Sequence, residues 1–144
     1  EFWEANTTRW DDDLDPQIGD EPALRPDSTL DVAFSRRQRG IEPWVGAAPN
    51  VASYRHITLL DALRLEPGDG SDAEIRRLMR ATAAAYLNAG YETMAFPFRR
   101  FQTAENGNPS LAAQLATALA SGEPADLIAL AERLEAANGL GCPL

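Results

Sequence analysis

The stretch that decides the fold is "SDAEIRRLMRATAAAYLNAG", residues 71–90. Its apolar and small residues recur every three or four positions, which is the spacing of an α-helix with one buried face. Ser71 and Glu74 have the spacing of a capping box, and Gly90 stands where a left-handed glycine ends a helix. The predicted buried face comprises Ile75, Leu78, Met79, Thr82, Ala85 and Tyr86.

Residues 109–139 repeat this helical pattern twice. Pro109 and Pro124 each occupy a first-turn position, and Gly122 and Gly139 each stand where a helix is expected to end. Because only "SGEP" joins the two helices, we expect antiparallel neighbours. The predicted buried positions are Leu111, Leu115, Ala118 and Leu119 in the first helix and Leu127, Leu130, Ala131 and Leu134 in the second.

Shorter helices are predicted in "STLDVAF" and "ITLLDALRL", residues 28–34 and 57–65, with Ser28 and Thr58 as their caps. Alternation typical of strands is nowhere sustained. The predicted fold class is therefore all-α, a compact small helical bundle. We expect one module over residues 1–144, in which residues 57–144 form the helical core and residues 1–56 a mostly irregular wrap with short helices.

The N-terminal segment is acidic and rich in proline, as in "DDDLDPQIGDEPALRPD", residues 11–27. Proline restricts its neighbours and removes backbone donors, so we predict a long irregular segment. Alternate aspartates can direct carboxylates at one calcium ion, although Pro16 occupies the position where an EF-hand loop needs glycine. The alternative is a solvated acidic loop. The candidate calcium ligands are Asp11, Asp13, Asp15 and Asp20.

Length and charge limit the classes of function. A chain of 144 residues with 44% hydrophobic content fits one domain with a sizeable core. The formal net charge of −9 argues against a nucleic-acid partner, since such binding needs a clustered cationic surface. No uncharged run approaches the roughly 20 apolar residues of a membrane-spanning helix, so no membrane span is predicted.

His56 is the only histidine, and Ser53 and Asp61 are the nearest residues suited to a hydrolase site. No nucleophile-elbow or metalloprotease pattern surrounds it, so a structural or exposed histidine is the favoured interpretation. The tryptophans Trp3, Trp10 and Trp44 suit a stacking platform for a sugar ring. Aromatic residues at such spacing are more often buried, so we expect Trp3 and Trp10 to fasten the N-terminal segment to the core.

The two ends of the chain resemble one bacterial module of surface and secreted proteins. That module typically opens with Gly-Tyr-Trp-Lys-Asn-His, has a second tryptophan seven residues after the first, and ends in a leucine-rich helix followed by Asn-Asn-Leu-Gly-Cys-Pro-Leu. In this sequence Phe2 and Trp3 resemble the aromatic pair, and Trp10 resembles the second tryptophan. The residues that resemble the ending are Asn138, Leu140, Gly141, Cys142, Pro143 and Leu144.

Segments between the two ends extend the resemblance over nearly the whole chain. They are "TLDVAF" (29–34), "TLLDAL" (58–63), "ATAAAYLNAG" (81–90) and "FP" (96–97). Glu4, Ala5 and Asn6 replace the lysine, asparagine and histidine of the opening, so no chemistry of those side chains is carried over. The retained residues are the aromatic ones.

The resemblance implies a secreted, cell-surface or periplasmic module that is attached to larger proteins and has a role in binding or assembly. Members usually have a cysteine just before the opening motif, which would pair with the terminal cysteine. That position would precede Glu1, so Cys142 has three alternatives: a disulfide partner outside this sequence, a free thiol, or a bond to another chain.

The predicted function is that of a non-enzymatic, extracellular or periplasmic module that binds a protein or serves as an accessory subunit of a surface assembly. The expected partner is another protein of that assembly. No cofactor is expected, with calcium as the one alternative. A carbohydrate-binding module and a hydrolase centred on His56 are the competing hypotheses.

Overall fold

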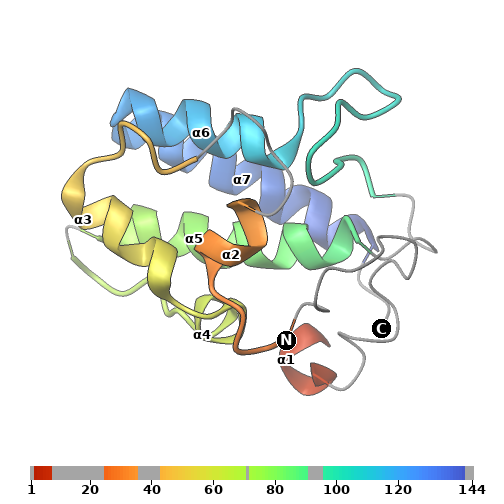
Figure 1. Cartoon of the computed structure of the whole chain (residues 1–144), viewed down its shortest axis with the longest axis horizontal. Coiled ribbons are helices and arrows are strands. Elements are labelled where there is room, and N and C mark those ends of the chain that lie inside the picture. The colour runs from red at the N-terminus through yellow and green to blue at the C-terminus, as the bar shows by residue number, and fades with distance from the viewer. Residues whose placement is uncertain (1, 8–24, 36–42, 71, 91–95, 142–144) are drawn as a thin grey trace.

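The computed structural model describes residues 2–7, 25–35, 43–70, 72–90 and 96–141. Within those ranges all extended regular structure is helical, and the all-α prediction is confirmed (Figure 1). The helices are α1 (Phe2–Ala5), α2 (Leu30–Ser35), α3 (Pro49–Ala52), the 3₁₀ helix η2 (Ser53–His56), α4 (Leu59–Leu63), α5 (Ala73–Asn88), α6 (Leu111–Ser121) and α7 (Pro124–Gly141).

Helix α5 lies at the centre of the bundle and packs against α4, α6 and α7 (Figure 1). All six of its predicted core positions are buried. Its second half is buried on nearly every side, because small residues there let other helices approach closely. Those additional buried residues are Ala81, Ala83, Leu87 and Asn88.

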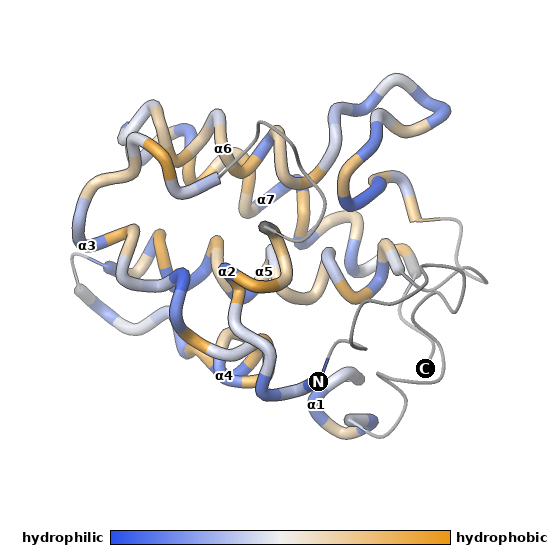
Figure 2. Tube along the Cα trace, viewed as in Figure 1, coloured by the Kyte–Doolittle hydropathy of each residue, from blue (hydrophilic) through white to orange (hydrophobic). Residues whose placement is uncertain are grey.

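Helices α6 and α7 form an adjacent pair, and Figure 1 shows α7 returning alongside α6 after the short connection. All eight predicted buried positions of the pair are buried. Helix α6 ends at Gly122, as predicted, and this glycine has the left-handed φ of +67°. In Figure 2 hydrophobic and hydrophilic colours alternate along both helices, as expected where one face packs on the core.

Several predicted helix starts are displaced. Ser71 lies outside the described residues, and Asp72 is the N-cap of α5 without a side-chain capping bond. In α6 the N-cap is Ser110, whose hydroxyl accepts a hydrogen bond from the backbone N–H of Ala113. Pro109 therefore precedes α6, so the prediction that it lies in the first turn was wrong. Pro124 does begin α7, as expected.

Two predicted helix ends were wrong for different reasons. Gly139 does not stop α7, which continues to Gly141. Gly90 has no positive φ, so it is not a left-handed stop. A Cβ at position 90 would lie 1.8 Å from Nη2 of Arg100, so any other residue there would displace that guanidinium.

The starts of α2 and α4 are joined to each other. The N–H of Leu30 donates to the carbonyl of Ile57 at 3.0 Å, and the N–H of Leu59 donates to the carbonyl of Ser28 at 2.8 Å. This pairing is an isolated antiparallel bridge between Thr29 and Thr58. It holds two short helices together that would be marginal alone.

Hydroxyl groups cap both of these helices. The Thr58 hydroxyl accepts from the N–H of Asp61 at 3.0 Å, which confirms the predicted cap of α4. In α2 the predicted cap was one residue off. Thr29 accepts from Val32 at 3.3 Å, whereas Ser28 accepts from the N–H of Arg25.

The N-terminal third contributes directly to the core of the bundle. The wrap and the helical core are thus packed into one hydrophobic cluster within the part of the chain that the structure describes. The buried apolar residues from positions before 57 are Trp3, Leu30, Ala33, Phe34, Trp44 and Val51.

Candidate functional site

A network of side-chain hydrogen bonds connects the two ends of the described structure. The indole Nε1 of Trp3 donates to Oδ1 of Asn88 at 2.7 Å, and Nδ2 of Asn88 donates to Oδ1 of Asn138 at 2.9 Å. The last bond of this network is donated by Nδ2 of Asn138 to the carbonyl of Ala81 at 3.1 Å. Three elements, α1, α5 and α7, therefore meet at the side chain of Asn88.

The direction of these hydrogen bonds is fixed by the donor of Trp3 at one end of the network and the carbonyl of Ala81 at the other. An indole N–H can only donate a hydrogen bond, and a backbone carbonyl can only accept one. Both amides between them must therefore present oxygen toward Trp3 and nitrogen toward Ala81. Trp3 and Asn88 are 3% and 1% exposed, so the bond between them is protected from competition by water, whereas the two bonds of Asn138 are only partly buried.

The helix contacts explain why these residues meet. Arg77 contacts Glu132 and Glu135, whereas Ala81 and Asn88 contact Asn138, so α5 and α7 run in the same general direction. The C-terminal halves of both helices consequently lie side by side. Helix α1 contacts α4, with an exposed ion pair between Glu4 and Arg64 at 3.8 Å.

Tyr86 organises the neighbouring part of the core. Its hydroxyl donates to the carbonyl of Ala33 at 2.7 Å, and its ring makes an edge contact with Phe34 at 4.8 Å between centroids. The guanidinium of Arg100 lies 4.3 Å from the ring centroid of Tyr86, and its Nε donates to the Tyr86 carbonyl at 2.8 Å. A cation near the end of α5 also interacts favourably with the helix dipole.

Most of the predicted ligand and motif residues lie outside the described part of the chain. This applies to Trp10, Cys142 and the candidate calcium ligands Asp11, Asp13, Asp15 and Asp20. Phe2 belongs to α1, but its side chain is likewise not described. Within the described ranges, no three His, Cys, Asp or Glu side chains are grouped as metal ligands.

The described tryptophans are core residues. Trp3 is 3% exposed and Trp44 is 5% exposed, so neither ring has an open face on which a sugar could stack. They differ in one respect, because Nε1 of Trp44 has no hydrogen-bond partner among the described residues, whereas that of Trp3 is bonded.

The structure does not bring His56, Ser53 and Asp61 into a hydrogen-bonded relay. His56 is exposed, and its Nε2 lies 3.2 Å from Nε of the adjacent Arg55. The Ser53 hydroxyl donates to the Asn50 carbonyl at 2.8 Å. Asp61 accepts from the hydroxyl of Thr58 at 2.7 Å, so both candidate partners are engaged in local turn and cap contacts.

An open polar cavity of about 220 Å³ lies at the start of α5. Tyr54, Asp69, Asp72 and Arg76 contribute to its wall, together with Gly68 and Gly70. Arg76 also reaches the carbonyl of Glu66 at 3.4 Å. The opposing charges around this cavity do not define one class of ligand.

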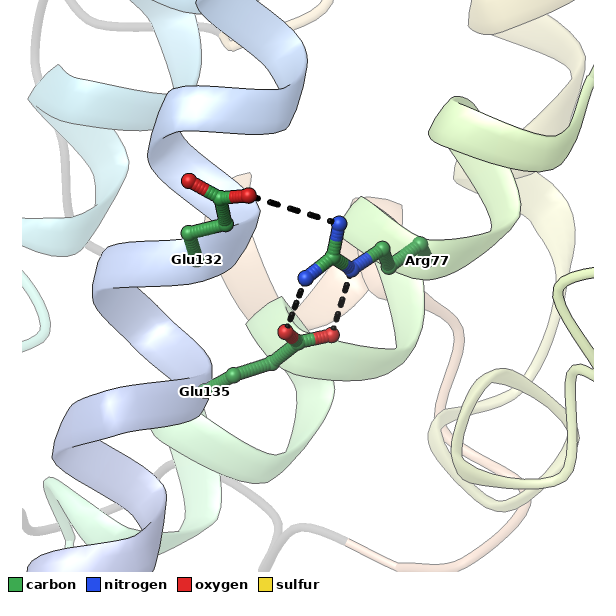
Figure 3. Close-up of polar contacts among 3 residues, drawn as sticks. All are labelled: Arg77, Glu132 and Glu135. Atoms are coloured by element: carbon green, nitrogen blue, oxygen red, sulfur yellow. Dashed lines mark hydrogen bonds and ion pairs between the residues drawn. The ribbon is translucent and has the colours of Figure 1, made fainter.

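On the outer side, Arg77 of α5 binds two glutamates of α7 (Figure 3). Its Nε and Nη2 donate to both oxygens of Glu135 at 2.9 and 2.6 Å, and Nη1 lies 3.8 Å from Glu132. The hydrogen bond to Glu135 raises the pKa of Arg77. The guanidinium therefore stays protonated at neutral pH, and its charge is lost only when the pH rises through that raised pKa.

Asn88 is the residue of this hydrogen-bond network that sequence reasoning missed. It stands three and seven positions after Ala85 and Ala81, on the same buried face of the helix. A lone amide among apolar and small residues at such a position indicates a buried hydrogen-bond network. Its partners were not predictable, because Trp3 and Asn138 are 85 and 50 positions away.

The fold and this site define an all-α module whose terminal helices are fastened through one buried amide. Comparison with known protein families gives no match, and neither curated proteins nor solved structures give a significant one. No helix in the described ranges is long and apolar enough to cross a membrane.

Proposed function

We propose that the chain is a non-enzymatic module of a secreted, cell-surface or periplasmic bacterial protein. In this proposal it binds another protein or serves as an accessory subunit of a larger surface assembly. The resemblance of its two ends to the bacterial module supports the location, and the packing of its motif residues supports a structural use for them.

The observation that carries the proposal is the joining of the two terminal motifs at Asn88. Trp3 belongs to the motif at the start and Asn138 to the motif at the end, and both bind the same amide. The middle segments of the resemblance are also core segments, with Leu30, Phe34 and Leu59 fully buried. These motif residues pack inside the fold, so a protein partner would bind the exposed residues of the surface.

Exposed apolar side chains are the natural first contacts with a protein partner. Val45 is 69% exposed and Leu140 is 84% exposed, at separate places in the chain. Glutamate at either position would place a charge in an interface and weaken binding.

The test is isolation of the tagged native protein from its source under non-reducing conditions, followed by mass spectrometry and quantification of companions. Val45→Glu and Leu140→Glu are compared with Gln102→Glu, which adds the same charge at an exposed polar position. We expect one companion at fixed stoichiometry, retained by Gln102→Glu and reduced by at least one apolar variant. Recovery of the protein alone would contradict the proposal.

A further inference from the structure

The bonds of Asn88 join two segments that are each weak by themselves. Helix α1 has four residues, too few for a helix to persist through its own hydrogen bonds. Its buried anchor is Trp3, which bonds to Oδ1 of Asn88. The docking of α1, which also contacts α4, is therefore sensitive to the orientation of this amide.

The last turn of α7 is weak for a different reason. Gly139 and Gly141 have poor helix propensity, and Leu140 between them is 84% exposed. Among the described residues, a Cβ at Gly139 would meet no atom within 4 Å, so none of them packs on this turn there. Just before it, Asn138 holds the helix to α5 through Asn88 and the Ala81 carbonyl.

One amide cannot serve these two segments independently. Asn88 is 1% exposed, so loss of Asn138 would leave its Nδ2 buried without an acceptor, which is costly. Rotation of the side chain to satisfy Nδ2 elsewhere moves Oδ1 away from the indole N–H of Trp3. The two bonds are therefore coupled through the orientation of one side chain.

We propose that Trp3, Asn88 and Asn138 form a conformational latch in which unwinding the end of α7 back to Asn138 releases α1 from the core. The latch transmits a change at the exposed end of α7 to a helix at the other end of the chain. Release of α1 uncovers the site that Trp3 occupies.

The latch is tested by hydrogen exchange of the indole N–H groups in the ¹⁵N-labelled full chain, with each signal assigned by a Trp→Phe variant. In Asn138→Ala we expect the Trp3 indole proton to exchange roughly tenfold faster or more, because a buried partner is lost. The Trp44 indole is the internal control and should change less than about twofold, since it belongs to neither bond. Asn106→Ala is the matched control, because that amide binds the Pro97 carbonyl.

A second variant tests the latch in the opposite direction without weakening the fold. Gly139→Ala strengthens the last turn of α7, and its Cβ would lie within 4 Å of no described atom, so Trp3 exchange should slow by about two- to fivefold relative to Trp44. Equal changes at Trp3 and Trp44 would indicate global stability alone and overturn the proposal. An unchanged Trp3 rate in Gly139→Ala would overturn it even if Asn138→Ala fails to fold.

Discussion

At the scale of single residues, burial decides which polar contacts stabilise this protein. The Arg77 side chain is 35% exposed and its partner Glu135 is 43% exposed, so their well-formed pair contributes at most about 1 kcal/mol. Asn88 is 1% exposed, and loss of one of its partners costs about 1–3 kcal/mol because a buried group remains unsatisfied. The buried amide therefore outweighs the bidentate ion pair.

The two buried tryptophans allow this difference to be measured. Trp3→Phe removes the N–H that Asn88 accepts, whereas Trp44→Phe removes an N–H without a described partner. Both changes lose the same side-chain volume. We expect Trp3→Phe to lower the free energy of unfolding by about 1–3 kcal/mol more than Trp44→Phe in urea denaturation. Equal losses in the two variants would show that the Trp3 bond contributes nothing net.

At the scale of helices, the two glycines predicted as stops for α6 and α7 should respond oppositely to alanine. Gly122 has φ +67°, where a Cβ is strained, so Gly122→Ala should destabilise the protein by about 1 kcal/mol. Gly139 lies inside α7, and no atom of the described residues lies within 4 Å of a Cβ placed there, so Gly139→Ala should stabilise by up to about 1 kcal/mol. Thermal unfolding of both variants checks this; a loss of stability in Gly139→Ala would place the end of α7 before that residue.

The junction after α5 offers a second test at this scale. Gly90→Ala would push Arg100 away from Tyr86 and cost about 1–3 kcal/mol, since the Cβ would lie 1.8 Å from the guanidinium. In an Arg100→Ala background this clash is gone, and the same change should cost little. The double-mutant cycle in urea measures the coupling; additive effects would mean that Arg100 does not occupy this position.

The same glycines show what the sequence can predict about helices. Helix existence and buried faces followed from local spacing, and every predicted core position of α5, α6 and α7 is buried. The helix ends were predicted less well, because three glycines that are alike in sequence have different roles. Gly122 is a left-handed stop, Gly139 lies inside α7, and Gly90 lies close to Arg100. Only tertiary contacts, such as that of Arg100 with Gly90, distinguish these roles.

At the scale of the whole molecule, the site was less predictable than the fold. The aromatic residues near the start and the asparagine near the end were recognised as motif residues, but their connection was not. Asn88 joins them because α5 and α7 run in the same direction and bring their C-terminal halves together. Helix periodicity specifies which faces are buried and leaves open which pairs of helices meet at them.

The arrangement of the aromatic core leads to a prediction for the intact protein. A sugar-binding platform needs exposed rings, whereas Trp3 and Trp44 are both inside the hydrophobic cluster. In a Trp10→Phe variant only these two tryptophans emit, so acrylamide should quench the native protein several-fold less than the same variant unfolded in urea. The wild-type chain, measured in parallel, reports the added contribution of Trp10. Quenching of the native variant as strong as that of the unfolded chain would show that the rings are open to solvent, and would favour the sugar-binding hypothesis over a module whose tryptophans hold the bundle together.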